Sequence, residues 1–539
     1  MRAGESPTRF LLTAALAVVL ICSYAAGCGG ERAEKEEGPG ESGTLRACVI
    51  GDPGALDPAF LEDVEDIQIA GLIFDGLMRH DPVSLELEPA MAESYLVNDD
   101  ATVFTFHLRK GVKFQNGRWC TADDFAYSWS RVCALDTAGA ASYHLKPVKG
   151  YQEVVSGRAE ELEGVRALDD YTPEVSLSYP YADFAYRTAH PCLSPIPREV
   201  VEEYGSESFG EHPVGTGPFE FVEWRHQEKV VLRRSPDHYG REEPGLDGLV
   251  FRVYPDQETA HSDFLAGELD ESPLPSGELT AERENGGDGT VTETVQGLYY
   301  LGFNLNTEPW SSSPRLRRAL NYAVDKSVLS EGIMEGAYEA AAGIVPPAAV
   351  GSGQDACDYR YDPREASRLL AEAGYPGGEG LPALTLSYPL GEEYEETARA
   401  LRADLAGLGL DVSMDGYTWD TYTNLIANDR ISLFIMDYVP DYPIMDAYLA
   451  PLFYPYDTAE DWFKYSSPEV DDIISQARET VDEDLRLDLY RGAERKILDD
   501  VPLLPLMFHS SSRVHSERVG GYSLTELDYV PYDLVCLER

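Results

Sequence analysis

The side chains best suited to catalysis or metal binding are scattered along this sequence of 539 residues. Its ten histidines show no spacing typical of metal ligands, and the two closest together, His509 and His515, lie near one expected strand. The sequence contains no GxSxG, HExxH or P-loop pattern. A hydrolase needs a nucleophile beside a base, or a bound metal. We therefore expect a protein that is not an enzyme and that uses no metal or cofactor.

The clearest chemical signal is Cys28, which follows the small residues Ala25, Ala26 and Gly27. Before them, a basic start is followed by an apolar run over residues 10–21. This order is typical of a secretory signal, and the run is too short for a permanent membrane span. Small residues leading directly into a cysteine resemble a bacterial lipobox, so we expect Cys28 to be lipidated. An ordinary cleaved signal with an incidental cysteine is the alternative.

Export would place the remaining cysteines in an oxidising compartment. Cys120 and Cys133 flank an expected helix, which puts them about 20 Å apart at ~1.5 Å per residue. A disulfide needs Cα atoms within roughly 7 Å, so this pair is excluded. The other pairings among Cys48, Cys120, Cys133, Cys192, Cys357 and Cys536 stay open.

Composition limits the possible partners. The chain carries 43 basic and 95 acidic residues, with a net charge of −52. Such a field repels phosphate backbones, which excludes nucleic acid as a partner, and it disfavours adhesion to anionic lipid. The hydrophobic content of 43% is sufficient for a large packed core.

Local patterns predict both helices and strands. Helices are expected where a cap residue precedes an apolar-periodic run, often with proline at the first helical position. Strands are expected where apolar residues alternate or gather between turn signals. The expected helices begin after Thr121, Ser313, Asp362 and Ser467, with a long one over Glu483–Leu498; the expected strands cover Val103–Leu108, Val230–Arg233 and Leu249–Val253. This mixture indicates α/β lobes.

A series of short stretches runs along the chain in a fixed order. They are LDPAF (Leu56–Phe60), Pro89–Val132, VGTGPFEFVEW (Val214–Trp224), FLAGELD (Phe264–Asp270), YLGFNLNTEPW (Tyr300–Trp310), YDPREASRLLAEAGYPGG (Tyr361–Gly378), YSSPEVDDIISQAR (Tyr465–Arg478) and VPLLPLMF (Val501–Phe508). Together they resemble the peptide, nickel and related solute-binding proteins of ABC importers, usually called family 5. Each stretch alone is weakly specific, but their shared order is strongly specific.

The resemblance implies an α/β, two-lobed fold of the type II periplasmic-binding-protein kind, with a two-strand hinge and the ligand between the lobes. Residues 1–27 are expected to form the signal peptide and 28–43 an acidic tether. Hinge crossings are expected near 299–304 and 503–508. The remaining boundaries are 44–77, 211–298 and 505–539 for lobe one, 78–210 for an inserted subdomain of lobe one, and 299–504 for lobe two.

The resemblance also implies a ligand site in lobe two. Peptide-binding relatives pair with the peptide main chain and hold its free α-amino group with an aspartate that follows an aromatic residue. The segment MDYVPDYP, Met436–Pro443, is similar to that part of the family. Asp441 is therefore expected to bind an ammonium group, beside Tyr438 and Val439. A turn-capping role for Asp441 is the alternative.

Further ligand contacts are expected from lobe one. Glu62, Asp63 and Val64 match the segment whose backbone pairs with peptide in relatives, with an ordinary surface turn as the alternative. Tyr143 is the nearest equivalent of a tyrosine in the inserted subdomain. Ile435 replaces the arginine that meets the carboxyl terminus of short peptides, so the resemblance leaves the peptide length open.

The implied partners are a short peptide or peptide-like molecule, the ABC permease and ATPase subunits, and a membrane reached through the lipid anchor. The protein is expected to act as a monomer on the outer face of the cytoplasmic membrane. A nickel complex, an oligosaccharide or another solute is the alternative ligand. A receptor or chaperone role without transport is the alternative function.

Overall fold

The computed structural model describes residues 43–538 except 135, 138–139, 241–244, 276, 285–288, 335, 337, 354–358 and 456–461. The expected signal peptide, the Cys28 anchor, the tether up to residue 42 and Cys357 lie outside the described residues. Among the described residues, Cys48, Cys120, Cys133, Cys192 and Cys536 are all free.

Lobe one begins with a four-stranded sheet in the order β1-β10-β9-β8. Its strands are β1 (Thr44–Ile50), β10 (Gly248–Tyr254), β9 (Lys229–Arg234) and β8 (Phe219–Arg225), and its nearby helices are α1 (Val64–Ile73) and α6 (Gln257–Leu265). The strands expected at Val230–Arg233 and Leu249–Val253 are confirmed. β1 pairs with β10 in parallel, although 197 residues separate the end of β1 from the start of β10. The chain therefore completes this sheet only after it has formed the inserted subdomain.

The inserted subdomain carries a second four-stranded sheet, ordered β4-β5-β7-β6. Its elements are β2 (Met78–His80), β3 (Leu87–Pro89), β4 (Ala92–Val97), β5 (Val103–Leu108), α2 (Ala122–Cys133), α3 (Tyr151–Val155), β6 (Val165–Asp169), β7 (Thr172–Ser176), α4 (Phe184–Arg187) and α5 (Arg198–Tyr204). Phe104 and Phe106 are fully buried, as the alternation in β5 predicts. The subdomain shares one continuous core with the first sheet.

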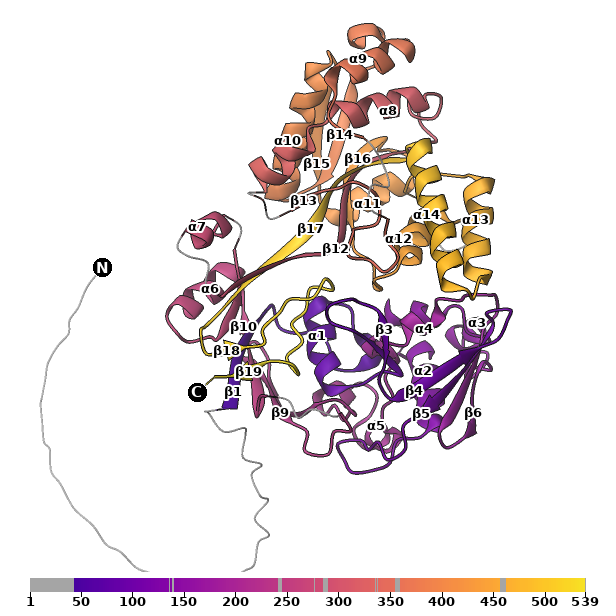
Figure 1. Ribbon diagram of the computed structural model, residues 1–539, viewed down its shortest axis with the longest axis vertical. Coiled ribbons are helices and arrows are strands. Elements are labelled where there is room, and N and C mark those ends of the chain that lie inside the picture. Colours follow the sequence, from indigo (N-terminus) through magenta and orange to yellow (C-terminus); the bar gives the residue numbers. More distant parts are fainter. Residues whose placement is uncertain are drawn as a thin grey trace, which may run out of the picture. The chain divides into compact units, whose positions relative to one another are not determined.

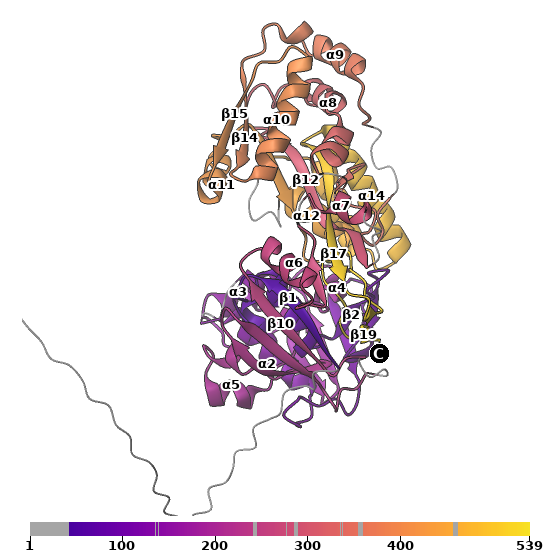
Figure 2. The same ribbon diagram turned by 90° about the vertical axis from the view of Figure 1, so that its left-hand side faces the viewer.

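A seven-stranded sheet, ordered β11-β17-β12-β16-β14-β15 with β13 on β17, forms the framework of lobe two, and its β11 edge contacts β1 of lobe one. The strands are β11 (Glu271–Pro273), β12 (Thr290–Phe303), β13 (Glu339–Ala340), β14 (Leu384–Pro389), β15 (Val412–Tyr417), β16 (Leu433–Tyr438) and β17 (Leu503–His515). The helices are α8 (Pro314–Ala323), α9 (Pro363–Glu372), α10 (Glu392–Gly407), α11 (Trp419–Ala427), α12 (Met445–Phe453), α13 (Pro468–Glu479) and α14 (Glu483–Asp500). Two views show α8, α9 and α10 gathered beside β14 and β15 (Figures 1 and 2).

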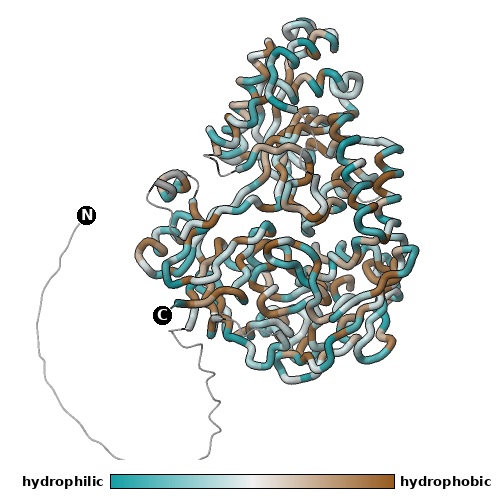
Figure 3. The backbone as a smooth tube through the Cα atoms, in the orientation of Figure 1, coloured by the Kyte–Doolittle hydropathy of each residue, from teal (hydrophilic) through white to brown (hydrophobic). Residues whose placement is uncertain are grey.

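The sheet of lobe two separates two cores. Along β12, Leu298 and Tyr300 pack into one core, whereas Tyr299 and Leu301 pack into the other. This alternation follows from the two-residue period of a strand. Hydrophobic stretches accordingly gather on the strands, while α13 and α14 carry mixed hydrophobic and hydrophilic turns (Figure 3).

The helix starts agree with the cap residues. Thr121 and Asp124 form a capping box at the start of α2. The Ser313 side chain accepts from the Leu316 amide, and the Asp362 side chain accepts from the amides of Arg364 and Glu365. These bonds satisfy amides that have no partner within the helix.

The hinge strands β12 and β17 are long and adjacent (Figure 1). The crossings expected at 299–304 and 503–508 are displaced, because most of these residues already pack in the two cores of lobe two. Val291 packs on the core of lobe one instead, and Val514 packs in a small cluster with Leu274. The strands therefore change lobe at about Thr292–Thr294 and Ser510–Ser512, which pair with one another.

The physical reason for this displacement is that apolar runs mark burial within a lobe. Between the lobes the paired strands are more polar and only half-buried, and the Thr292 and Ser512 hydroxyls lie 2.9 Å apart. The expected boundary at 504/505 between lobe two and the last part of lobe one lies before this polar step and stays a prediction. The last segment returns to lobe one, where Leu524, Val530 and Tyr532 are part of the core.

Candidate functional site

The segment after β16 carries the expected lobe-two ligand residues. Tyr438 is half-buried, and its hydroxyl donates to the Ala447 carbonyl at 2.8 Å. Val439 is 55% exposed and Asp441 is exposed, whereas the following Tyr442 is buried. Tyr438 is thus held by its own lobe, whereas Val439 and Asp441 are exposed.

Asp441 is met by a residue of the inserted subdomain. The Tyr143 hydroxyl donates a hydrogen bond to the Asp441 carboxylate. Burial raises the pKa of Tyr143, and the neighbouring Asp441 charge raises it further, so the hydroxyl stays protonated as a donor. The structure therefore brings together two of the expected ligand residues, which are separated by 298 positions in the chain.

A second contact lies directly beside this pair. His144 Nδ1 and the Tyr442 hydroxyl share a hydrogen bond. The Arg187 guanidinium donates to the His144 carbonyl at 3.1 Å and lies 5.3 Å from the centre of the Tyr442 ring. Sequence reasoning missed these three residues, although Tyr442 is adjacent to Asp441 and His144 is adjacent to Tyr143.

A buried network of ion pairs also joins the lobes. Asp183 of the inserted subdomain lies 2.7 Å from Arg486, and Asp446 lies 2.8 Å from Arg478. The Tyr490 hydroxyl is within 3.0 Å of both Asp183 and Asp446. Burying a charge is unfavourable unless it is paired and hydrogen-bonded, so these groups depend on one another. No local spacing in the sequence signals this network.

The expected lobe-one residues lie elsewhere in the structure. Glu62 and Asp63 line a cavity of about 360 Å³ together with Asp57, Asp66 and Glu207. Burial raises the pKa of Asp66 to about 6, although the amides of Gly54 and Ala55 donate to it.

Val64 is the first residue of α1 and is 46% exposed. Within the described ranges, neither Glu62, Asp63 nor Val64 forms a hydrogen bond or ion pair with Asp441. The structure thus joins Tyr143 to Asp441 but does not bring the 62–64 segment into contact with it.

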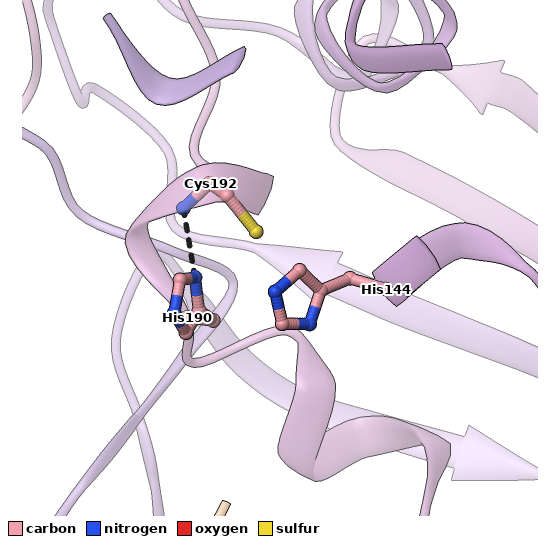
Figure 4. Close-up of side chains that lie close together, drawn as sticks. All are labelled: His144, His190 and Cys192. Atoms are coloured by element: carbon pink, nitrogen blue, oxygen red, sulfur yellow. Dashed lines mark hydrogen bonds between the residues drawn. The ribbon is translucent and has the colours of Figure 1, made fainter. Parts of the chain in front are cut away.

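Three side chains with metal-ligand chemistry gather beneath the Tyr143–Asp441 contact. Potential ligand atoms of His144, His190 and Cys192 lie within 4.8 Å of one another, and all three residues are buried (Figure 4). The His190-x-Cys192 spacing was the only sequence signal for this group. Burial lowers the pKa of His144 and His190 and raises that of the Cys192 thiol.

The orientation of these rings favours packing over coordination. The imidazoles of His144 and His190 stack at 4.5 Å with an interplanar angle of 27°. A metal ion lies in the plane of the imidazole ring that binds it. Stacked rings therefore direct their nitrogen lone pairs along nearly parallel lines, which do not converge on one ion. His190 Nδ1 already accepts the Cys192 amide at 3.2 Å. The group forms the support for Tyr442 and Tyr143, whose rings lie against His144.

None of the helices among the described residues is long and apolar enough to cross a membrane.

Comparison with known proteins gives one consistent result. Residues 86–460 match the model of the bacterial extracellular solute-binding proteins, family 5 middle region. The chain is 27% identical to the dipeptide-binding protein DppE of Bacillus subtilis, over 89% of each chain. It is 26% identical to heme-binding protein A of Haemophilus influenzae, over 96% of each chain.

The fold comparison agrees. The unliganded open form of the murein tripeptide binding protein MppA matches with a TM-score of 0.83 at 24% identity, covering 93% of this chain and 98% of that one. This likeness confirms the two-lobed α/β fold of the type II periplasmic-binding-protein kind.

Proposed function

This chain belongs to the bacterial extracellular solute-binding proteins of family 5, and we propose that it captures a short peptide between its lobes and delivers it to an ABC importer. The proteins that resemble it are named as binding proteins and not as enzymes. Their names include a dipeptide and heme as ligands, so family membership alone leaves the choice of ligand to the residues of the site.

One observation supports a peptide as the ligand. Asp441 is an exposed carboxylate at the meeting of two lobes, and its only hydrogen bond within the described structure comes from the neutral Tyr143 hydroxyl. No described lysine, arginine or histidine forms an ion pair with it. An anion in this position favours a cationic partner, and burying an ammonium without an anion is expensive. The α-ammonium group of a peptide has the required charge and size.

The neighbouring groups support the same assignment. Val439 is exposed just after β16, and its backbone pairs with no strand among the described residues. A peptide in extended conformation could pair with this backbone, as in other cases of strand addition. Glu62, Asp63 and Val64 are proposed as the facing contacts from lobe one.

Calorimetry with trialanine and N-acetyl-trialanine tests the proposal. Asp441→Asn keeps the side-chain size and removes the charge, so trialanine affinity should fall by roughly 30-fold or more, as for truncated charge pairs. The acetylated peptide should bind wild type poorly and should not respond to the substitution. Asp420→Asn, at an exposed position in the first turn of α11, is the matched control.

Equal binding of free and acetylated trialanine would rule out Asp441 as the ammonium site. A heme titration followed by absorbance tests heme as the alternative solute, since one relative is a heme-binding protein. Tight heme binding without peptide binding would replace the peptide by heme as the solute.

The anchor and the cellular location are part of the same proposal. Cys28 is proposed as the lipidated residue that holds the protein on the outer face of the cytoplasmic membrane, with residues 28–43 as a tether. Cys28→Ala should leave an unprocessed precursor. Native protein whose mature terminus is a residue other than Cys28 would contradict the anchor.

A further inference from the structure

A second group of side chains lies on the lobe-two sheet beside the hinge. Tyr299 of β12, Asp437 of β16 and His509 of β17 lie on the same face, because their neighbours Tyr300, Met436 and Phe508 all pack into the opposite core. Tyr299 and Asp437 are direct partners in the β12–β16 ladder. The Tyr299 ring lies 5.8 Å from the His509 ring.

Three residues from other elements complete this group. Tyr394, in the first turn of α10, stacks on Tyr299 at 5.2 Å, and its hydroxyl donates to the Asp437 carboxylate. Tyr338, just before β13, stacks on His509 at 5.3 Å with an interplanar angle of 11°. Burial raises the pKa of Tyr338, and the charge of the neighbouring Glu393 raises it further. We call the following six residues the aromatic–acidic cluster: Tyr299, Tyr338, Glu393, Tyr394, Asp437 and His509.

The cluster holds two carboxylates, and its histidine, His509, favours the neutral form because burial lowers its pKa. Burial raises the pKa of Glu393, and the Asp437 charge raises it further. No ion pair to Asp437 or Glu393 is formed by any lysine, arginine or histidine in the described part of the chain. Two neighbouring half-buried carboxylates repel each other, so a cation between them would be strongly favoured.

The cluster also has unused hydrogen-bonding capacity. The Tyr299 hydroxyl is buried and has no hydrogen-bond partner among the described residues, and the same is true of His509 Nε2. A buried polar atom without a partner is unfavourable by about 1–3 kcal/mol. Such atoms are normally satisfied by protein, water or ligand.

The position of the cluster links it to the ligand segments of both lobes. Asp437 and Asp441 are four positions apart, which is at most about 13 Å at ~3.3 Å per residue. Asp528 belongs to the last segment of lobe one, and its charge acts on both Tyr338 and His509. The same Asp528 charge acts on Glu65, immediately after the 62–64 segment.

We infer that the aromatic–acidic cluster binds an organic cation of the solute, an ammonium or guanidinium group, and so selects for peptides that carry a basic side chain near their amino terminus. Aromatic faces attract such cations in addition to the carboxylates. This inference rests on the proposed capture of peptides. It differs from the role of Asp441, which concerns the α-ammonium that every free peptide possesses.

Calorimetry on the mature protein tests the inference with four tetrapeptides of alanine. Two carry one lysine at the second or third position, and two carry norleucine there, which keeps the alkyl chain and lacks the charge. Wild type should bind the better lysine peptide at least about 30-fold more tightly than its norleucine match. Asp437→Asn should remove most of that preference and leave the norleucine affinities unchanged.

The matched variants are Glu393→Gln and Glu396→Gln, since both positions lie in α10 and only Glu393 belongs to the cluster. Glu393→Gln should reduce the lysine preference and Glu396→Gln should preserve it. Equal binding of lysine and norleucine peptides to wild type, or an equal loss for both in Asp437→Asn, would overturn the inference while leaving peptide capture intact. Failure of all four peptides to bind would contradict peptide capture itself and the inference with it.

Discussion

At the scale of single residues, the site is organised by contacts that cross between lobes. Asp441 would rotate freely at an exposed position, but the Tyr143 hydroxyl fixes one of its oxygens. Tyr143 is in turn supported by His144, whose ring lies 4.1 Å away, and Arg187 donates to the backbone carbonyls of both residues. The carboxylate of the proposed ammonium site is therefore already oriented in this structure, and such preorganisation lowers the entropy lost on binding.

Tyr143→Phe should consequently weaken trialanine binding about 10-fold, since a hydrogen bond to a charged group contributes about 1.5 kcal/mol or more. Calorimetry measures the effect, and Tyr361→Phe at a half-exposed position is the control. The N-acetylated peptide should not respond to the substitution. Unchanged affinity for trialanine would show that Tyr143 plays no part in orienting Asp441.

At the scale of elements, α12, α13 and α14 meet the inserted subdomain through the Asp183, Arg486, Asp446 and Arg478 network. Tyr490 on α14 connects its two ion pairs. A further backbone bond runs from the Ala182 amide to the Arg478 carbonyl at 2.8 Å. Paired charges in such a place are sensitive to the loss of any one member.

Tyr490→Phe should lower the free energy of unfolding by about 1–3 kcal/mol, because the buried Asp183 and Asp446 carboxylates lose the one hydroxyl proton that they share. Urea denaturation followed by tryptophan fluorescence measures the change. Tyr361→Phe again provides the control. A midpoint unchanged from wild type would mean that the hydroxyl is not needed to satisfy Asp183 and Asp446.

The last segment of the chain adds a pH-dependent contact at the hinge. Burial, together with the Glu293 charge, raises the pKa of Glu526 to about 7 from an ordinary value of 4.5. The folded protein therefore binds more protons here than the unfolded chain between about pH 4.5 and 7. By linkage, this carboxyl stabilises the fold at acidic pH, and its contribution is lost as the pH rises through 7.

Glu526→Gln should remove that part of the pH dependence. Thermal unfolding at several pH values from 5 to 8 should show a smaller decline in Tm for the variant than for wild type. Glu517→Gln, which lies in the same segment and has an exposed side chain, is the control. Parallel Tm profiles for wild type and Glu526→Gln would contradict the raised pKa.

At the scale of the whole molecule, two strands carry the chain between lobes that each have their own core. The Thr292–Thr294 and Ser510–Ser512 steps have few apolar contacts, so bending there disturbs neither core. A hinge of this kind allows a ligand to draw two lobes together, provided that the ligand binds the closed arrangement more tightly.

Small-angle scattering should therefore show a smaller radius of gyration with saturating peptide than without it. The measurement should be made on protein whose occupancy has been verified by calorimetry. The Asp441→Asn variant at the same peptide concentration is the control, because it should stay largely unliganded. An unchanged radius in fully occupied wild type would exclude closure.

The sequence by itself determined the family, the α/β class and many element boundaries. The helix starts after Thr121, Ser313 and Asp362 can be predicted, because a capping side chain bonds to amides only two or three residues away. The alternation of apolar and polar residues along β5 likewise predicts which face of the strand is buried. Asp441 and Tyr143 were predicted from the family resemblance, and their role in ligand binding stays a prediction.

Only the tertiary structure decided how these parts meet. Tyr143 and Asp441 are 298 positions apart, and Asp183 and Tyr490 are 307 apart. Tyr299, Asp437 and His509 become one cluster only when three strands pair in one register. The hinge was misplaced for the same reason. Apolar runs report that a residue is buried, whereas the lobe in which it is buried depends on packing between elements that no local pattern encodes.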